Sequence, residues 1–304
     1  MRIAGIDIGT NTILMTIADY DGYDLKIIRD EHSLARLGQY LNQTGVISEQ
    51  ALYRAVKILN NYKLICENLN VDHINAAGTS ALRDAKNSGD VLKILSETLN
   101  NNIRVLSGSE EAKVSFLGTV EDDQESMVVD IGGGSTEIIH GKETNIFNHI
   151  SIQMGAVRLA EKYLLPHPPE PDNIQSAITS IRQDLDSVKF ASDDCKLYAV
   201  AGTPTTLAAI SLGLKDYDRE KVHLYKLSKN KINQLVDLLF KTSLNDIIEK
   251  FGVNPMRADV ISAGGLILKL IMEKLEKDSV IAVSYTHLRA HETPEHLVCR
   301  LLLE

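Results

Sequence analysis

One stretch of the sequence decides the fold: MVVDIGGGSTE, at residues 127–137. A short apolar run ends in the carboxylate of Asp130, and after Ile131 come three glycines and two hydroxyl residues. Glycines permit a tight reversal and leave backbone N–H groups uncovered, which suits a polyphosphate group. Asp130 would repel phosphate unless a divalent cation lay between them, most simply Mg²⁺. Taken alone, the stretch is equally compatible with a hairpin turn after a buried strand.

A second copy of this pattern favours the phosphate-binding interpretation. Residues 3–12 read IAGIDIGTNT, an apolar strand followed by Asp7, glycine, and hydroxyl and amide residues. Another motif also occurs twice, as AAGTSAL at residues 76–82 and as VAGTPTTL at residues 200–207. The two offsets, 130 − 7 = 123 and 202 − 78 = 124, are nearly equal. We therefore predict an internal duplication in which two similar halves face each other across a cleft.

Composition and charge limit the class of protein. The chain has 304 residues, enough for two domains with a core each. Its net charge of −9 argues against general nucleic-acid binding, although a local groove or Mg²⁺ can still hold a polyanion. Three scattered cysteines, Cys66, Cys195 and Cys299, fit a reducing cytosol better than a disulfide framework. The sequence shows neither a signal peptide nor a membrane-spanning stretch, so we expect a cytoplasmic protein without a membrane partner.

The order of elements predicts an open α/β sheet in each half. In the first half, strands are expected at 3–7, 12–19, 25–33, 71–77 and 103–106. Helices separate the later of these strands, and Ser48 is the expected N-cap of the first long helix. The second half repeats this plan, with strands at 127–130, 135–140, 145–152 and 196–201, helices near 155–164 and 172–188, and a long helix from Met256. The proline-rich segment 166–171 predicts a surface connection with His167 exposed. The lysines of residues 215–231 predict a solvated surface.

The helix that begins at SGSEEA, residues 107–112, carries two adjacent glutamates. With Ser107 as N-cap, Glu110 falls at the third helical position and completes a capping box, which gives Glu110 a structural role. Glu111 is not used by the box, and the helix dipole favours its ionised form. A carboxylate that stays charged can accept a proton from water, so Glu111 is our candidate general base. The alternative is that Glu111 is a dipole partner and nothing more.

Several stretches together carry a family resemblance. They are GIDIGTNT (5–12), GTSALRDA (78–85), SGSEEA (107–112), DIGGGSTE (130–137), MGAVRL (154–159), AGTPTTLA (201–208) and RADVISAGG (257–265). In this order they resemble the exopolyphosphatase/guanosine pentaphosphate phosphatase family, within the actin-like, sugar-kinase-like and Hsp70-like ATPase superfamily. The resemblance implies an α/β fold of two actin-like (ribonuclease H-like) domains with a central cleft. We expect these domains at residues 1–124 and 125–281.

The resemblance implies an activity and a set of ligand-binding residues. The activity is hydrolysis of the terminal phosphate of inorganic polyphosphate, of pppGpp, or of both. Asp7 and Asp130 match the acidic positions that hold Mg²⁺, and Glu137 matches an acidic position near the metal. Two loops match the phosphate-binding loops of the family: Thr10, Asn11 and Thr12 in the first, and Gly132, Gly133, Gly134, Ser135 and Thr136 in the second.

Two further matches carry the chemistry. Arg83 matches the basic residue expected near the transferred phosphate, where it would stabilise charge on the departing phosphoryl group. Glu111 matches the water-activating glutamate of the family, with Glu110 a less favoured candidate for the same role. The expected partner is the substrate itself, inorganic polyphosphate or pppGpp. No nucleic acid or membrane is expected, and a homodimer is the assembly that we consider.

The C-terminal segment departs from the family pattern. After about Ile281 the pattern would continue with a Ser-Asp-x-Gly-type strand and a Leu-Arg-Gly-type ending, which this sequence lacks. Residues 282–304 resemble vector- or adapter-derived tails, so we exclude them from the predicted fold. Their histidines and Cys299 lack a recognisable zinc spacing.

The leading hypothesis is therefore polyphosphate hydrolysis, and the runner-up is pppGpp 5′-phosphate hydrolysis in the same cleft. An ATP-binding actin-like module or kinase is a different class. It would need a base placed for an alcohol acceptor, and the sequence offers one candidate, at the Glu111 position. A sensor that binds polyphosphate or alarmone without turnover is the remaining alternative.

Overall fold

The computed structural model describes residues 1–22, 25–120, 123–190 and 195–284, which form two compact units that divide at residues 121–122. Each unit is described by itself. The N-terminal unit contains a five-stranded sheet in the order β3-β2-β1-β4-β5. Its strands are β1 (Arg2–Ile8), β2 (Thr12–Tyr20), β3 (Leu25–Leu34), β4 (His73–Gly78) and β5 (Ile103–Val105). Its helices are α1 (Leu41–Thr44), α2 (Glu49–Asn68), α3 (Ser80–Asp84), α4 (Ser88–Leu99) and α5 (Gly108–Thr119).

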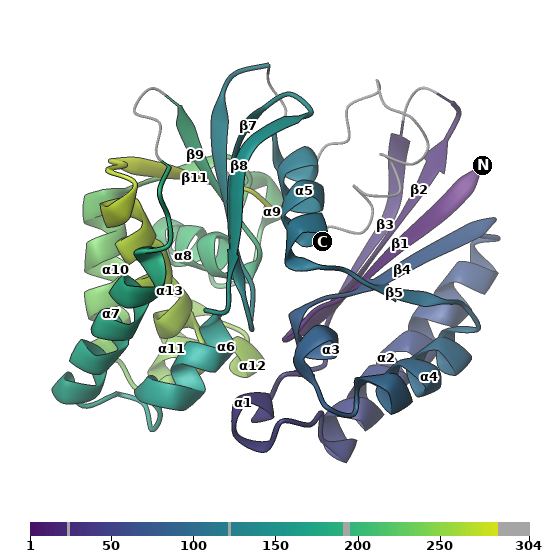
Figure 1. Ribbon diagram of the computed structural model, residues 1–304, viewed down its shortest axis with the longest axis horizontal. Helices are drawn as coiled ribbons and strands as arrows, with labels where there is room; N and C mark the ends of the chain where they lie inside the picture. The colour runs from purple at the N-terminus through teal and green to yellow at the C-terminus, as the bar shows by residue number, and fades with distance from the viewer. Residues whose placement is uncertain (23–24, 121–122, 191–194, 285–304) are drawn as a thin grey trace. The chain divides into compact units, whose positions relative to one another are not determined.

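Helices α2 and α4 lie side by side and cover one face of this sheet (Figure 1). Alternate residues of β1, such as Ile6 and Ile8, point into the core beneath these helices and are fully buried. The predicted cap of α2 is confirmed, because the hydroxyl of Ser48 accepts a hydrogen bond from the amide of Ala51. Tyr62 of α2 donates its hydroxyl proton to the carbonyl of Ile13, 2.9 Å away, which ties the helix to β2.

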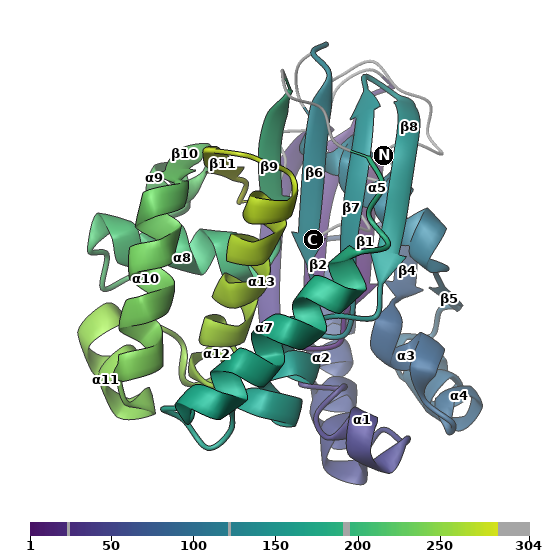
Figure 2. The same ribbon diagram turned by 60° about the vertical axis from the view of Figure 1, so that its left-hand side comes forward.

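The C-terminal unit contains a six-stranded sheet in the order β10-β11-β9-β6-β7-β8. Its strands are β6 (Ser126–Ile131), β7 (Thr136–Lys142), β8 (Asn145–Ile152), β9 (Lys196–Val200), β10 (Tyr225–Ser228) and β11 (Ser279–Ala282). Its helices are α6 (Ala156–Leu159), a π-helical turn (Ala160–Leu164), α7 (Pro171–Leu185), α8 (Gly202–Leu212), α9 (Arg219–Val222), α10 (Lys229–Lys241), α11 (Leu244–Phe251), α12 (Pro255–Ala258) and α13 (Ile261–Lys274). Helices α7 and α13 pack against each other, and Figure 2 shows both in front of the sheet.

The two units repeat one topology, as the duplicated motifs predict. The antiparallel strands β1, β2 and β3 correspond to β6, β7 and β8, and the parallel neighbour β4 corresponds to β9. The first hairpin of each unit closes with the same backbone hydrogen bond. The amide of Gly9 donates to the carbonyl of Thr12 at 2.9 Å, and the amide of Gly132 donates to that of Ser135 at 3.0 Å.

Three segments differ from the sequence predictions. Residues 215–231, predicted to be a solvated surface, contain α9 and β10 as well as exposed lysines. Strand β10 forms because Tyr225–Ser228 pairs with β11 at the edge of the sheet. The long helix expected from Met256 is interrupted after α12, and its apolar part begins at Ile261. Residues 282–284 belong to the fold, since the amide of Val283 donates to the carbonyl of Ala199 at 2.9 Å. The foreign origin proposed for residues 282–304 stays a prediction, and residues 285–304, with Cys299, lie outside the described residues.

The side chain of His167 is half-buried, whereas the sequence predicts an exposed one. Its Nε2 lies 3.0 Å from the carbonyl oxygen of Leu239 and donates to it in the neutral ring. Burial lowers the pKa of His167, although hydrogen bonds to the backbone of Leu239 and Thr242, and to a smaller extent the charge of Asp259, oppose this effect. Because the folded-state pKa lies below the unfolded one, the unfolded chain binds the proton more readily, and stability falls as the pH drops below the ordinary histidine pKa of about 6.5.

We therefore expect His167→Gln, which retains a side-chain donor but does not titrate, to flatten the acid side of the stability profile. The measurement is the thermal unfolding midpoint at several pH values from neutral down to the pKa range of the carboxylates. The wild-type midpoint should fall more than that of the variant as histidine becomes protonated. Two parallel curves would contradict this role of His167.

Candidate active site

The candidate residues of the N-terminal unit gather at one edge of its sheet. Strands β1, β4 and β5 are parallel, so their carboxyl ends lie at the same edge, where ligands bind in open α/β sheets. Asp7 lies at the end of β1, Arg83 lies in α3 just after β4, and Glu111 lies in the first turn of α5 just after β5. The folding of the unit thus brings Arg83 and Glu111 into contact and places Asp7 at the same edge of the sheet.

The first candidate phosphate-binding loop, residues 10–12, turns its carbonyl groups toward the interior of the N-terminal unit. The carbonyl of Thr10 accepts from the amide of Gly38, and that of Asn11 from the amide of Arg36, each at 2.8 Å. Among the residues that the structure describes, the buried Oδ1 of Asn11 has no hydrogen-bond partner. Because planar trans peptides hold C=O and N–H on opposite sides, carbonyls fixed on one side leave amides directed to the other. The loop therefore has the chemistry of an anion-binding turn.

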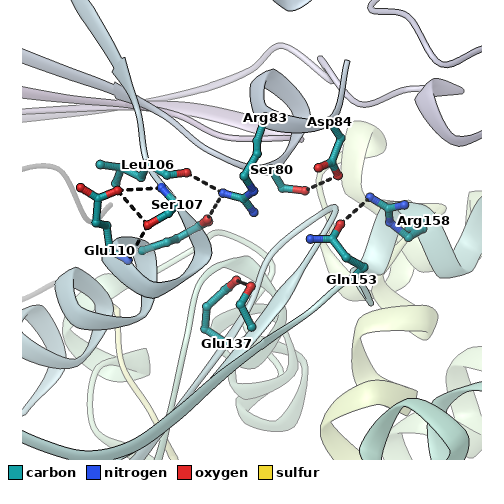
Figure 3. Close-up of polar contacts among 11 residues, drawn as sticks. Ser80, Arg83, Asp84, Leu106, Ser107, Glu110, Glu137, Gln153 and Arg158 are labelled. Atoms are coloured by element: carbon teal, nitrogen blue, oxygen red, sulfur yellow. Dashed lines mark hydrogen bonds and ion pairs between the residues drawn. The ribbon is translucent and has the colours of Figure 1, made fainter. Parts of the chain in front are cut away.

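Arg83 and Glu111 form an ion pair. Nη1 of Arg83 lies 3.0 Å from Oε2 of Glu111 and donates to the carbonyl of Leu106 at 2.7 Å, the contact with Leu106 being drawn in Figure 3. The two side chains are 22% and 14% exposed, so the pair is only partly solvated. Within the described part of the chain, the buried Nη2 of Arg83 has no hydrogen-bond partner. A buried donor without an acceptor costs about 1–3 kcal/mol, which a phosphoryl oxygen could recover.

The neighbouring Glu110 has a different environment. Its carboxylate accepts from the amide and hydroxyl of Ser107, both at 2.8 Å, and its own amide donates to that hydroxyl at 3.2 Å (Figure 3). The predicted capping box is therefore confirmed. The backbone hydrogen bond from Ser107 is the main reason that the pKa of Glu110 lies below its ordinary value. This use of Glu110 leaves Glu111 as the glutamate directed at Arg83.

The second loop, residues 132–135, is held by the segment Gly155–Arg158. The carbonyl of Gly132 accepts from the amide of Ala156 at 2.9 Å. The carbonyl of Gly133 accepts from the amides of Val157 and Arg158, at 3.0 and 3.1 Å. This loop, like the first, turns its carbonyls toward its own unit, so its amides are available on the other side.

Gly155 allows this close contact. A Cβ atom built at Gly155 would lie 2.3 Å from the carbonyl carbon of Gly133 and 2.4 Å from the amide nitrogen of Gly134. These contacts are with backbone, which cannot move aside as a flexible side chain can. Residue 155 must therefore be glycine for the loop to keep this position. The family motif MGAVRL contains Gly155 and Arg158, but sequence reasoning gave neither a role at the site.

The hydroxyl residues of the second loop are buried. Thr136 donates its hydroxyl proton to the carbonyl of Met154, so this donor is already used within the unit. Ser135 is 1% exposed. A phosphate-binding role for the Ser135 and Thr136 side chains stays a prediction, and the backbone of the loop is the stronger candidate.

Two carboxylates lie opposite each other beside the second loop. Asp130 of β6 is the register partner of Glu137 of β7, so both side chains project from the same face of the sheet. Glu137 is 1% exposed and accepts a hydrogen bond from the hydroxyl of Ser151 at 2.7 Å. Like charges directly opposite are destabilising, and a cation between them would relieve the repulsion. In the first hairpin, the residue opposite Asp7 is Leu14. A pair of facing carboxylates therefore occurs in the hairpin of the C-terminal unit but not in that of the N-terminal unit.

This donor set fits Mg²⁺ rather than a caged metal. The described residues contain no group of three or more His, Cys, Asp or Glu side chains arranged to hold a metal ion. Mg²⁺ in phosphoryl-transfer sites is commonly held by one or two carboxylates, with substrate phosphates and water completing the shell. Asp130 and Glu137 are compatible with that arrangement. Cys66 and Cys195 are buried, and neither forms a disulfide.

Comparison with protein families identifies the chain. The model of the Ppx/GppA phosphatase family matches residues 16–290. The chain belongs to this family. The match ends at residue 290, beyond the last of the quoted motifs, RADVISAGG at 257–265.

Individual relatives cover most of this chain. A bifunctional 3-dehydroquinate synthase/phosphatase of Fusobacterium nucleatum is 32% identical over 91% of the chain, which spans 44% of that longer protein. Exopolyphosphatase 2 of Mycobacterium tuberculosis is 28% identical over 91% of both chains. A guanosine-5′-triphosphate,3′-diphosphate pyrophosphatase of Pseudoalteromonas atlantica is 28% identical over 90% of the chain and 58% of its own length.

Solved structures agree in fold. The Ppx/GppA family member of Aquifex aeolicus has a TM-score of 0.80 and 29% identity, over 98% of this chain and 96% of that one. An exopolyphosphatase-like protein reaches a TM-score of 0.90 with 28% identity over the same shares. The α/β class and the two-domain actin-like fold are thus confirmed. None of the described helices is both long enough and apolar enough to cross a bilayer.

Proposed function

We propose that this Ppx/GppA phosphatase is an exopolyphosphatase that releases terminal orthophosphate from inorganic polyphosphate. The observation that carries the proposal is the Arg83–Glu111 pair, 3.0 Å apart at the ligand-binding edge of its sheet. The choice of polyphosphate is supported by the exopolyphosphatase of Mycobacterium tuberculosis, which is 28% identical to this chain.

In the mechanism that we propose, Glu111 orients a water molecule and accepts its proton as the water oxygen attacks the terminal phosphorus. As that P–O bond forms, the terminal phosphoanhydride bond breaks, and orthophosphate and the shortened polyphosphate chain are released. Arg83 holds the Glu111 carboxylate through Nη1 and offers its buried Nη2 to the departing phosphoryl group. The amides of the two loops bind the phosphate oxygens. Phosphoryl transfer requires little covalent chemistry from the protein, so this positioning supplies most of the rate.

The proposed cofactor is Mg²⁺, with Asp130 and Glu137 as its holders in the C-terminal unit and Asp7 in the N-terminal unit. When bound, the ion would neutralise negative charge on the terminal phosphates. The Asp130–Glu137 pairing supports the proposal. We expect chelation with EDTA to abolish phosphate release and added Mg²⁺ to restore it. Full activity after exhaustive chelation would contradict a role for any divalent cation.

The substrate assay compares long-chain polyphosphate with pppGpp at equal terminal-phosphate concentration, with Mg²⁺ present. We expect orthophosphate release from polyphosphate at the higher kcat/KM. Release from pppGpp alone would favour the second candidate, pppGpp 5′-phosphohydrolase, which the Pseudoalteromonas relative supports. Release from neither would contradict the proposed function. A cytoplasmic location and a homodimer are further proposals, which cell fractionation and sedimentation would test.

A further inference from the structure

The contacts that hold the two phosphate-binding loops correspond at two positions. In each loop the amide of the glycine two residues after the aspartate donates to the carbonyl three residues further on, Gly9 to Thr12 and Gly132 to Ser135. The carbonyl of the residue after that glycine accepts from backbone amides, Thr10 from Gly38 and Gly133 from Val157 and Arg158. The loops differ at the following carbonyl, which belongs to Asn11 in the first loop and to Gly134 in the second.

These two carbonyls receive different donors. The carbonyl of Asn11 accepts from the backbone amide of Arg36 at 2.8 Å. The carbonyl of Gly134 accepts from a side chain instead, from Nε of Arg158 at 2.9 Å. The guanidinium is itself anchored, because its Nη2 donates to Oε1 of Gln153 at 3.1 Å, as Figure 3 shows.

The Gly134–Ser135 peptide is the one most in need of a fixed orientation. Its neighbours on the N-terminal side are held by backbone contacts, and glycine at 134 permits many conformations. If this peptide flipped, its carbonyl oxygen would face the phosphate and repel it, and the loop would lose the Ser135 amide as a donor. A donor locked on the Gly134 carbonyl prevents the flip before the substrate arrives.

We propose that Arg158 is a positioning residue that presets the second phosphate-binding loop by holding the Gly134 carbonyl, with Gln153 fixing the guanidinium. The inference rests on the proposed function, because it presumes that residues 132–135 bind phosphate. Arg158 acts through the loop rather than by contact with the reacting atoms. Its planar guanidinium, with Nε and Nη2 pointing to two different acceptors, suits this task in a way that the single ammonium of lysine does not.

The test measures tripolyphosphate binding by calorimetry, in the presence of Mg²⁺, to Glu111→Gln protein, which is expected to turn the ligand over far more slowly than the wild type. Adding Arg158→Ala should weaken binding by about tenfold to a hundredfold, the loss expected for a charge-assisted hydrogen bond that orders a site. Arg158→Lys should remain weak despite its charge, and free guanidinium should partly restore binding to the alanine variant. Gln153→Ala should weaken binding less, while the thermal unfolding midpoint stays near that of the parent.

The matched control is Arg182→Ala, which removes another arginine of the same unit, one that pairs with Glu273 on the surface at 3.6 Å. Equal binding by the Arg158→Ala and Arg182→Ala proteins would overturn the inference, and so would full recovery with Arg158→Lys, since charge alone would then explain Arg158. If the Arg158→Ala protein does not fold, the Gln153→Ala protein decides. Tripolyphosphate binding by Gln153→Ala equal to that of the Glu111→Gln parent would then overturn the inference. Absence of binding by the Glu111→Gln parent itself would instead remove the proposed function, and the inference with it.

Discussion

Glu111→Gln is expected to lower kcat for phosphate release by about 10²–10⁴-fold, the usual contribution of a general base. The substitution preserves the size of the side chain and an oxygen that can accept from Nη1 of Arg83, now 3.0 Å away. It removes the group that, in the proposed mechanism, takes the proton from water. Substrate affinity should remain near normal, because the proposed phosphate-binding loops are untouched. The measurement is orthophosphate release under saturating polyphosphate, together with equilibrium binding.

Glu110→Gln is the matched control for this prediction. The neighbouring residue has the same side chain, but its carboxylate belongs to the capping box with Ser107. We expect a small loss of stability, since glutamine can still complete the box, and a kcat close to that of the wild type. Equal losses of kcat in both variants would contradict the assignment of Glu111 as base. Unchanged turnover in Glu111→Gln would favour the alternative in which Glu111 is a dipole partner.

Gly155→Ala is expected to produce the second large loss, about 10²-fold or more in kcat/KM. The added Cβ would lie within 2.3–2.4 Å of the Gly133–Gly134 peptide, so the second loop, which we propose binds phosphate, must shift. Displacement of a positioned group by about 1 Å can cost this much in rate. The effect should occur on binding as well as on turnover, which distinguishes it from Glu111→Gln.

Gly89→Ala is the control for adding a methyl group. Gly89 lies in α4, and a Cβ there meets nothing within 4 Å. Alanine in a helix is favoured over glycine by about 0.5–1 kcal/mol, so this variant should be slightly more stable and fully active. Activity of Gly155→Ala within twofold of the wild type would mean that the loop tolerates displacement, and that its position does not depend on glycine at 155.

Much of the fold could be predicted from the sequence because its motifs sit at strand ends. An apolar run followed by aspartate and glycine specifies a strand and its turn locally, and both hairpins form as expected. Strand β10 was missed because it has one fully buried residue, Leu227, and exists through pairing with β11, more than fifty residues later. Such a strand depends on tertiary contacts rather than on its own pattern.

The same distinction applies to the site. Glu111 could be singled out because the capping box accounts for Glu110 within four residues of sequence. The contact of Arg158 with Gly134 spans 24 residues and joins a side chain to a backbone carbonyl, which no residue pattern announces. Gly155 likewise looks like any glycine before a helix until its distance from the loop is known.

The central claim is that water, activated by Glu111, attacks the terminal phosphorus of a phosphoanhydride chain. The most direct measurement follows a single turnover of tripolyphosphate in ¹⁸O-labelled water and locates the label by mass spectrometry. We predict one labelled oxygen in the released orthophosphate, and no measurable product from Glu111→Gln on the same timescale. Label found in the pyrophosphate product instead, or an equal yield from Glu111→Gln, would contradict the claim.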